Sequence, residues 1–495
     1  MASNTTYGDW MRPMPGGLRN IGVPLTFAGL GVLVATLIVS MVNVIAAIVL
    51  LLVGLSVILV LAIRDREHRN RVERAMERHV WLSVMRSGAN LYRSGMLAPI
   101  DAGQTLLPGI LSKVGLTEAL DGLGHRFCLV RHARGGEYSL LLACQPQGAS
   151  LADDDVEDSY VASWAALMES LASETGVTQL AVTVDTAPDS GVRFRRTLSR
   201  RMVDDAPDLA ARAMAQIMDQ YAAGGASNEV ILALTFRYTD HEGHVLDASE
   251  AARRISLLLP SIRAQIAAAG GGAARALSMD EIARMVRVAF DPKAQETFEE
   301  MDEPAVVDWV DCGPSACEAG WDWYKHDSGL SRTWEMVDPP RSNVTADTLA
   351  RLLAPLPDCD RKRVTVLYRM LPPDKTMFMA EQNRQKAAAQ VGQERRATVR
   401  SMSQIGKANR QAGEANRGAV MVFFGLLVTA TVTSGEQERR RLEAASRAVE
   451  QAAGSAKIDL RVCYGAQDTG FAASLPLGLN VRSYMPAGLL GRLTA

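Results

Sequence analysis

The chain has 495 residues, of which 48% are hydrophobic, and its 53 basic and 55 acidic residues give a net charge of -2. This balance gives no global argument for a nucleic-acid binder, so any such contact would have to come from a local patch. The six cysteines are scattered along the chain. We expect no structural disulfides, because the charge pattern described below predicts that most of the chain lies in the cytoplasm, where thiols stay reduced.

An uncharged apolar stretch runs from Ile21 to Ile63 and is about twice as long as one membrane-crossing helix requires. The polar residues Ser40 and Asn43 divide it, so we predict one helix over residues 24–40 and a second over 44–63. Residues 21–63 are therefore predicted to form a transmembrane helical hairpin. A secretory signal peptide is the main alternative, but its apolar region would span only about 7 to 15 residues and would end at a small-residue cleavage site.

Positive charges flank the predicted hairpin on both sides, and the turn between its helices has none. By the positive-inside rule, both ends of the hairpin should lie in the cytoplasm. We therefore expect a multi-pass protein of the cell membrane, with a cytoplasmic tail (residues 1–20) and a large cytoplasmic body. The flanking arginines are Arg12, Arg19, Arg64, Arg66, Arg69, Arg71 and Arg74.

The first half of the body shows alternating apolar periods of two and 3.6 residues, which are typical of mixed α and β layers. Residues 64–135 should form a basic juxtamembrane helix, to about residue 85, and a linker. Residues 136–270 should form a first α+β lobe, a small α/β sandwich for which a ferredoxin-like fold is one candidate. The predicted strands are 138–144, 179–185 and 229–239, and the predicted helices are 156–175, 208–223 and 248–268.

The second half begins with a connecting segment, residues 271–362, that holds a helix at 278–290 and an irregular stretch rich in tryptophan. These large side chains either pack a small lobe or anchor an interface. They are Trp309, Trp321, Trp323 and Trp334.

Residues 363–495 should form a second α+β lobe with a long polar helix. Its element order resembles that of the first lobe, so we expect two related lobes, although no exact sequence repeat is visible. The apolar segment 421–432 is too short for a third membrane span and is predicted to be a buried strand. The predicted strands are 363–371, 419–433 and 457–464, and the predicted helices are 377–417 and 437–452.

Two charged segments are candidates for contacts with partners. The helix predicted at 377–417 is polar on all sides, so it should either project as an arm or fold back near Gly392 and Gly413. The arginines between Arg193 and Arg201 could meet anionic lipid, nucleic acid or an acidic partner, or form a solvated face neutralised by Asp204 and Asp205. Direct contact with nucleic acid is left open.

Catalytic signatures are missing from the sequence. No G-x-x-x-x-G-K-[ST] phosphate loop is present, so the chain should not hydrolyse nucleotides alone. His241 and His244 have the wrong spacing for a zinc helix and are predicted to lie in a turn. Cys312, Cys317 and His326 match no common zinc pattern. We therefore predict a protein that is not an enzyme, with no catalytic, cofactor-binding or metal-binding residues.

Three segments carry a resemblance to a known family. GLSRTWEMVDPP (329–340), RVTVLYRMLPPDKT (363–376) and KIDLRVCYGAQDTGFAASLPLGL (457–479) resemble the N-terminal domain of the conjugation ATPases of type IV secretion systems. In that family the last segment leads into the motor domain, which has no counterpart in this chain. The predicted hairpin and its TYGDW start (6–10) are similar to PrgI-type small membrane subunits, and the whole arrangement resembles an actinobacterial membrane protein of conjugative elements.

The resemblance implies a bacterial inner-membrane scaffold of a type IV secretion-like or conjugal DNA-transfer apparatus that anchors and docks a separate P-loop motor ATPase. It also implies other membrane subunits of the transfer channel and a homo-oligomer as partners. The alternative is a membrane-tethered adaptor or regulatory protein unrelated to transport.

Overall fold

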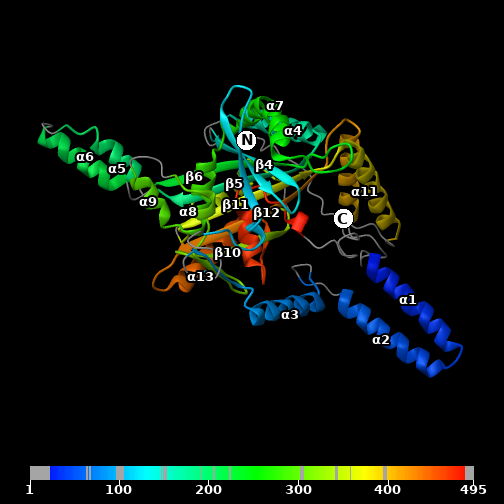
Figure 1. Cartoon of the computed structure of the whole chain (residues 1–495). Coiled ribbons are helices and arrows are strands. Elements are labelled where there is room, and N and C mark those ends of the chain that lie inside the picture. Colours follow the sequence, from blue (N-terminus) through cyan, green and yellow to red (C-terminus); the bar gives the residue numbers. More distant parts are fainter. Residues whose placement is uncertain are drawn as a thin grey trace.

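The computed structural model describes residues 23–484 except 63–64, 66–68, 96–97, 99–104, 147, 149–152, 190, 204–206, 222–224, 302–305, 341–343, 357 and 394–398. The predicted tail, residues 1–20, lies outside these ranges. Helices α1 (Val23–Ser40) and α2 (Val44–Ala62) project from a body built on one large sheet, and α3 (Arg71–Ser87) lies beneath that body (Figure 1).

Helices α1 and α2 pack against each other and are joined at residues 41–43, where the sequence predicts the break. The side-chain oxygen of Asn43 accepts hydrogen bonds from the backbone N–H groups of Ile45 and Ala46 and so caps the start of α2. Within the described part of the chain, Val44–Leu61 is the one stretch long and apolar enough to cross a membrane. The apolar part of α1, Phe27–Ser40, is shorter.

Helix α3 falls where the sequence predicts a basic helix over about 64–85, but it begins later, at Arg71, and ends at Ser87. It begins with a capping box, in which the Asn70 side chain accepts from the N–H of Glu73 (2.7 Å) and the Glu73 carboxylate accepts from the N–H of Asn70 (2.9 Å). It ends at Gly88, whose φ of 69° lies in the left-handed region. Glycine adopts this conformation without steric cost because it has no β-carbon. The Asn70 amide also donates to the carbonyl of Leu61, 3.4 Å away, so the start of α3 is tied to the end of α2.

The body is built on one 13-stranded sheet whose strands all pair antiparallel. The order is β1-β8-β9-β10-β12-β11-β5-β6-β4-β3-β2, with β13 beside β10 and β7 beside β4. The strands are β1 (Leu91–Arg93), β2 (Val114–Leu120), β3 (Arg126–His132), β4 (Glu137–Gln145), β5 (Val177–Pro188), β6 (Ala226–Phe236), β7 (Ala273–Ala276), β8 (Ala316–Ala319), β9 (Tyr324–His326), β10 (Gly329–Asp338), β11 (Arg361–Met370), β12 (Val422–Thr433) and β13 (Asp459–Val462).

The remaining helices of the described body are distributed over both halves of the chain. They are α4 (Asp154–Ser173), α5 (Val192–Ser199), α6 (Asp208–Tyr221), α7 (Ala248–Ile266), α8 (Met279–Phe290), α9 (Ala294–Glu300), α10 (Ala350–Leu353), α11 (Pro373–Gln393), α12 (Val399–Ala415), α13 (Glu438–Ser455) and α14 (Gln467–Ser474). The fold is thus α+β, as predicted. The expectation of two separate sandwiches is corrected, because β5 and β11 pair directly and join the two lobes as halves of one sheet.

The two halves repeat one topology around the β5–β11 junction. On one side the strand order is β5-β6-β4-β3-β2, and on the other it is β11-β12-β10-β9-β8, with β7 and β13 in matching places. Thr183 of β5 pairs with Thr365 of β11, and their hydroxyl oxygens lie 3.1 Å apart. Because two equivalent antiparallel strands meet at this pair, an approximate two-fold axis passes through it and relates the halves. We call residues 114–290 the first half and residues 316–474 the second half.

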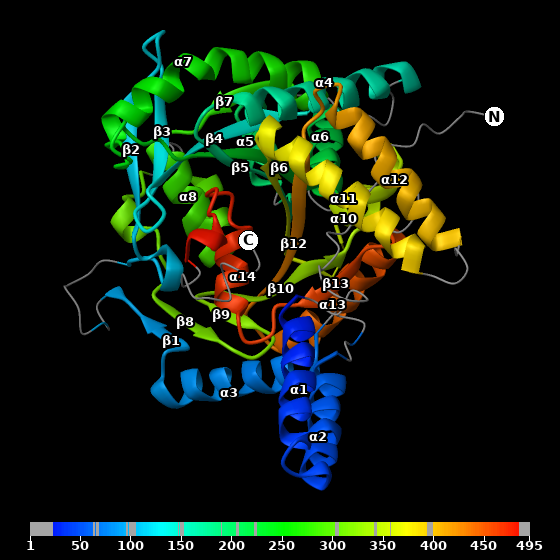
Figure 2. The ribbon, with the colours of Figure 1, turned by 90° about the vertical axis from the view of Figure 1, so that its right-hand side faces the viewer.

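Apolar side chains fill both faces of the sheet. Along β6, Ile231 and Ala233 join the cluster on the inner face, whereas Leu232, Leu234 and Phe236 join the cluster on the outer face. The inner face packs against α8 and α14, and the outer face is covered by α4 and α7 in the first half and by α13 in the second (Figure 2). The alternation follows from the two-residue period of a strand that is buried on both sides.

Several predicted elements need correction. The single helix at 377–417 is two helices, α11 and α12, which pack side by side, so the fold-back interpretation is the correct one. The linker 64–135 contains β2 and β3, and the segment expected to be irregular contains β8, β9 and β10. The apolar segment 421–432 forms β12, in which Val428, Ala430 and Val432 are fully buried, so the predicted buried strand is confirmed.

Candidate functional site

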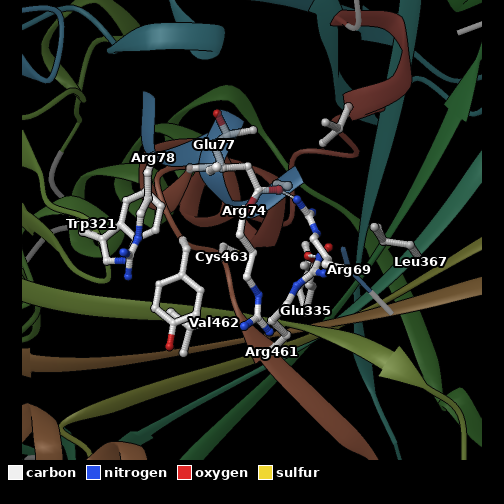
Figure 3. Close-up of a pocket in the computed structure, with 18 of the residues that line it drawn as sticks. Arg69, Arg74, Glu77, Arg78, Trp321, Glu335, Leu367, Arg461, Val462 and Cys463 are labelled. Carbon is white, nitrogen blue, oxygen red and sulfur yellow. Dashed lines mark hydrogen bonds and ion pairs between the residues drawn. The ribbon is translucent and has the colours of Figure 1, made fainter. Parts of the chain in front are cut away.

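A pocket of about 900 Å³ lies between α3 and the inner face of the second half (Figure 3). The body side is formed by residues of β10 to β13, by the turn that follows β13 and by α14. Besides α3, the lining includes Glu335, Leu367, Leu427, Arg461, Val462, Cys463, Tyr464, Thr469, Gly470 and Ala473. We call this cavity the α3 pocket.

Arginine dominates the charge of the α3 pocket. Five arginines and two glutamates line it, which leaves an excess of three positive charges: Arg69, Arg71, Arg74, Arg78 and Arg461 against Glu77 and Glu335. Arg69 pairs with Glu77, and Arg461 pairs with Glu335 on the neighbouring strand. Arg74 reaches Asp65 at 2.6 Å, but both partners are about half exposed, so that pair adds little stability.

Aromatic rings fix α3 to the body beside the pocket. Trp81 of α3 is 8% exposed and its ring lies 6.1 Å from that of Trp321, which stacks on Tyr464 at 5.5 Å. The backbone N–H of Gly465 donates to the carbonyl of Trp321, and a β-carbon at Gly465 would approach the Trp321 ring to 2.9 Å. Rings of this size bury a large apolar area, so they hold the helix in place and form one wall of the pocket.

The other tryptophans of the connecting segment favour the packing interpretation over an exposed anchor. Trp334 is fully buried in the outer cluster of the second half. The Trp309 indole donates to the carbonyl of Val114 at 3.1 Å, and the Arg439 guanidinium lies 5.0 Å above the Trp323 ring.

Cys463 is the one thiol that lines the α3 pocket, and it is not activated. Burial raises its pKa to about 12, although the nearby Arg461 and Arg69 act in the opposite direction. All six cysteines are free thiols. Burial likewise raises the pKa values of Cys312 and Cys317 to about 12, so these thiols stay protonated at neutral pH.

The histidines singled out in the sequence have structural roles. His241 and His244 lie in a turn, as predicted, where the Asp240 carboxylate accepts from the backbone N–H of His244 at 2.8 Å. Cys317 and His326 face each other across β8 and β9. Both ring nitrogens of His326 are already engaged, with the Phe290 carbonyl at 2.6 Å and the Ser331 hydroxyl at 2.7 Å. No group of three metal-ligating side chains occurs in the ranges that the structure describes.

The two halves carry the same buried hydrogen-bonded trio. In the first half the ring of His132 lies 3.0 Å from the Ser139 hydroxyl, which lies 2.8 Å from that of Thr235. In the second half the corresponding residues are His326, Ser331 and Thr431, with both distances 2.7 Å. All six side chains are buried, and burial lowers the pKa of each histidine to about 4. A buried, neutral His–Ser pair of this kind connects strands and cannot meet a substrate.

The trios also show that the halves exchange backbone segments. The Leu477 carbonyl, which follows α14, lies 3.1 Å from the His132 ring, and the Gly478 carbonyl accepts from the Thr235 hydroxyl. Conversely, the Phe290 carbonyl at the end of α8 meets His326 of the second half. Each half is thus completed by residues at the end of the other half or directly after it.

The first half has a pocket in the position that matches the α3 pocket, with a volume of about 460 Å³. Arg275 of β7 and Arg461 of β13 occupy matching places, since they pair with Ala143 of β4 and Glu335 of β10. The charged residues of this pocket are Asp185, Glu229, Glu281 and Glu299, together with Arg275, Arg284 and Arg361. We call it the α9 pocket, because α9 lies at its mouth where α3 lies in the other half.

Asp185 is the centre of a buried ion network in the α9 pocket. Its carboxylate lies 2.9 Å from the Arg361 guanidinium and 3.3 Å from that of Arg363. Burial alone would raise its pKa, but the two guanidinium groups outweigh that effect and lower it. The matching residue of the second half, two positions beyond Thr365 as Asp185 is beyond Thr183, is Leu367.

The predicted arginine cluster lies far from the α3 pocket. Its helix, α5, projects from the body together with α6, well away from α3 (Figure 1). The Arg196 guanidinium donates to the carbonyl of Met301 at 2.6 Å, which links α5 to the segment after α9. Asp204 and Asp205, the expected neutralising residues, lie outside the described residues.

Sequence reasoning missed the α3 pocket. Arg69, Arg71 and Arg74 on its α3 side count in the sequence only as topology signals, and Arg461 lies almost 400 residues further along the chain. Comparison with protein families gives one match, to a domain of unknown function (DUF8461), over residues 16–73. The matched segment contains α1, α2 and the first residues of α3. No curated protein matches the chain.

Proposed function

We propose that this chain is a non-catalytic, membrane-anchored scaffold of a type IV secretion-like or conjugal transfer apparatus that docks a separate P-loop motor ATPase. The observation that carries the proposal is the direct succession of two apolar helices, a basic helix tied to them and a large body built on one sheet. Such an order holds a body against a bilayer surface, where a cytoplasmic motor can meet the other subunits of a channel.

In this proposal α1 and α2 form a transmembrane hairpin with both ends in the cytoplasm. Their 18 and 19 residues correspond to about 27 Å and 28 Å of helix, close to the thickness of a hydrocarbon core. Large apolar side chains on both helices are exposed in the isolated chain, including Leu37 (64%) and Ile45 (76%). A lipid environment would remove this surface from water.

Two pairs of helices are candidates for contacts with the motor and with neighbouring copies. The α5–α6 pair follows β5 and the α11–α12 pair follows β11, so both emerge at matching places of the two halves. On α11 and α12, Phe378 is 70% exposed and Met402 is 64% exposed, and large exposed side chains of this kind often anchor interfaces. The segments that resemble conjugation ATPases all lie in the second half or directly after it, which favours α11–α12 as the docking element.

The test is to solubilise the tagged full-length chain from its native membrane in mild detergent and to identify what co-purifies, with stoichiometry. Recovery of a P-loop ATPase is the expected result, and the double variant Phe378→Ala/Met402→Ala should reduce that recovery. Leu209→Ala/Ile217→Ala on α6 makes the same change on the other candidate pair, because both of those residues are also exposed; a larger loss there would move the docking element to α5–α6. If a kinase, a receptor or the chain alone is recovered, the membrane-tethered adaptor replaces this proposal.

A further inference from the structure

We propose that the α3 pocket binds the phosphate-bearing headgroup of an anionic phospholipid. This inference rests on the proposed membrane anchoring of α1 and α2. It adds a ligand class and a site to that proposal, and it can fail while the anchoring stands.

The position of the pocket places it at the level of lipid headgroups. Helix α2 ends at Ala62, and the Asn70 amide that caps α3 contacts the Leu61 carbonyl at 3.4 Å. Arg71 and Arg74 of the pocket wall belong to the first turn of α3. A helix that crosses the bilayer ends in the interfacial region, so these arginines would lie where phosphates are.

Helix α3 has the two faces of a helix that lies in the interface. Val72, Met76 and Val80 recur at four-residue spacing and are 45%, 60% and 56% exposed. The arginines of the pocket, Arg71 and Arg78 among them, lie on a different side of the helix. In Figure 2, α3 runs crosswise to α1 and α2, the arrangement expected when the pair crosses a membrane and α3 rests on its surface.

The α3 pocket combines an enclosed volume, basic side chains and aromatic rings, and this combination suits a lipid headgroup better than a flat basic surface does. Its volume, about 900 Å³, is that of a small-molecule site, and the positive excess comes from α3 while the Trp321 and Tyr464 rings form an apolar wall. Arg71 and Arg78 supply guanidinium groups in excess of the two lining carboxylates, and guanidinium is the side chain best suited to bidentate contact with phosphate.

The α9 pocket is an internal control for this argument. It occupies the matching place in the first half, yet its four carboxylates outnumber its three arginines, and among the described elements no apolar helix pair lies beside it. The positive excess is therefore a property of α3 and not of the sheet topology.

The experiment is native mass spectrometry of the purified full-length chain in detergent, titrated with phosphatidylglycerol or with phosphatidylcholine. We expect preferential retention of phosphatidylglycerol and a loss of about tenfold in its apparent affinity in the double variant Arg71→Gln/Arg78→Gln, since each basic residue near a membrane surface contributes severalfold. Arg86→Gln/Arg93→Gln is the matched control, because it removes two exposed arginines nearby that do not line the pocket. An equal loss of phosphatidylglycerol affinity in both double variants would show that the lipid does not bind in the α3 pocket.

Two further measurements separate the sources of phosphate and the two proposals. Soluble glycerol 1-phosphate should fail to displace the lipid at concentrations that saturate the lipid site; displacement at equal concentration would assign the pocket to a free phosphate ester and overturn the lipid. Alkaline extraction of native membranes should leave the chain in the pellet. If the chain is released, the anchoring proposal falls together with this one. If it stays and phosphatidylglycerol is not preferred, only the headgroup inference falls.

Discussion

The first and second halves of the sheet share a buried hydrogen-bonded network and differ at their pockets. Both contain the buried His–Ser–Thr trio, and both contribute one threonine to the pair on the two-fold axis. At the pockets, however, Asp185 of one half is replaced by Leu367 in the other, and α9 by α3. The comparison teaches that the recurring residues hold the strands together, whereas the residues that differ give each half its own surface chemistry.

The largest expected effect tests whether the two histidines act as an equivalent pair. Burial lowers the pKa of His132 and of His326 to about 4, against about 6.5 in the unfolded chain, so the unfolded chain binds more protons between those values. The contribution of the neutral histidines to the free energy of unfolding should be fully present above pH 6.5. It should fall by about 3 kcal/mol for each histidine as the pH drops to 4. The measurement is the unfolding midpoint of the detergent-solubilised chain as a function of pH.

Single substitutions sharpen that test. His132→Gln and His326→Gln should each remove about half of the histidine-linked part of the pH dependence, because the groups titrate in separate halves. His326→Gln should lower stability at pH 7 more, since both nitrogens of His326 are bonded while Nδ1 of His132 has no partner in the described structure. Equal stability at pH 4.5 and pH 7 would refute the assignment.

The second prediction concerns a substitution that gives the first half the residue found at the matching position of the second half. Asp185→Leu copies the residue of the second half but leaves the buried Arg361 and Arg363 without their carboxylate, so it should cost about 3–5 kcal/mol of unfolding free energy. Adding Arg361→Met and Arg363→Met should recover most of that loss, because the unpaired charges are removed. Chemical denaturation measures both effects, and a stable single variant would show that the ion network is dispensable.

The smallest expected change in stability comes from substitutions in the threonine pair on the two-fold axis. Thr365→Val removes the bond to Thr183 and also the hydrogen bond that Thr365 donates to the Ser474 carbonyl at 2.8 Å. Thr183→Val removes only the first, so we expect Thr365→Val to cost about 1 kcal/mol more in unfolding free energy. Equal losses of unfolding free energy in the two variants would mean that the hydrogen bond from Thr365 to the Ser474 carbonyl adds no stability.

Long elements with a strong apolar period could be predicted from the sequence, and short paired strands could not. Helix α7 and strands β5, β6 and β12 lie within a few residues of their predicted bounds. Strands β8 and β9 have only four and three residues and gain their stability from pairing, β8 with β9 and β9 with β10, which local patterns do not report.

The order of elements in the sequence predicts two related lobes, but it predicts neither which residues match between them nor the α3 pocket. Outside the His–Ser–Thr trios and the Thr183–Thr365 pair, matching positions carry unlike residues, such as Leu142 and Trp334 or Asp185 and Leu367, so the repeat is preserved mainly in strand register. The pocket joins α3 to β13 across most of the chain. Of the features of this pocket, the sequence alone shows only the basic character of the segment after α2.

The exchanged segments have a consequence for how the chain is made. The Leu477 carbonyl that completes the first half follows His132 by 345 residues, and ribosomes add about 5–20 residues per second, so His132 waits roughly 20 to 70 s for this hydrogen-bond partner. During that interval the slot for Leu477 and Leu479, both buried in the finished core, stays open. Biogenesis of this protein should therefore depend on chaperone cover during translation, and nascent chains halted before residue 475 should be preferred protease substrates.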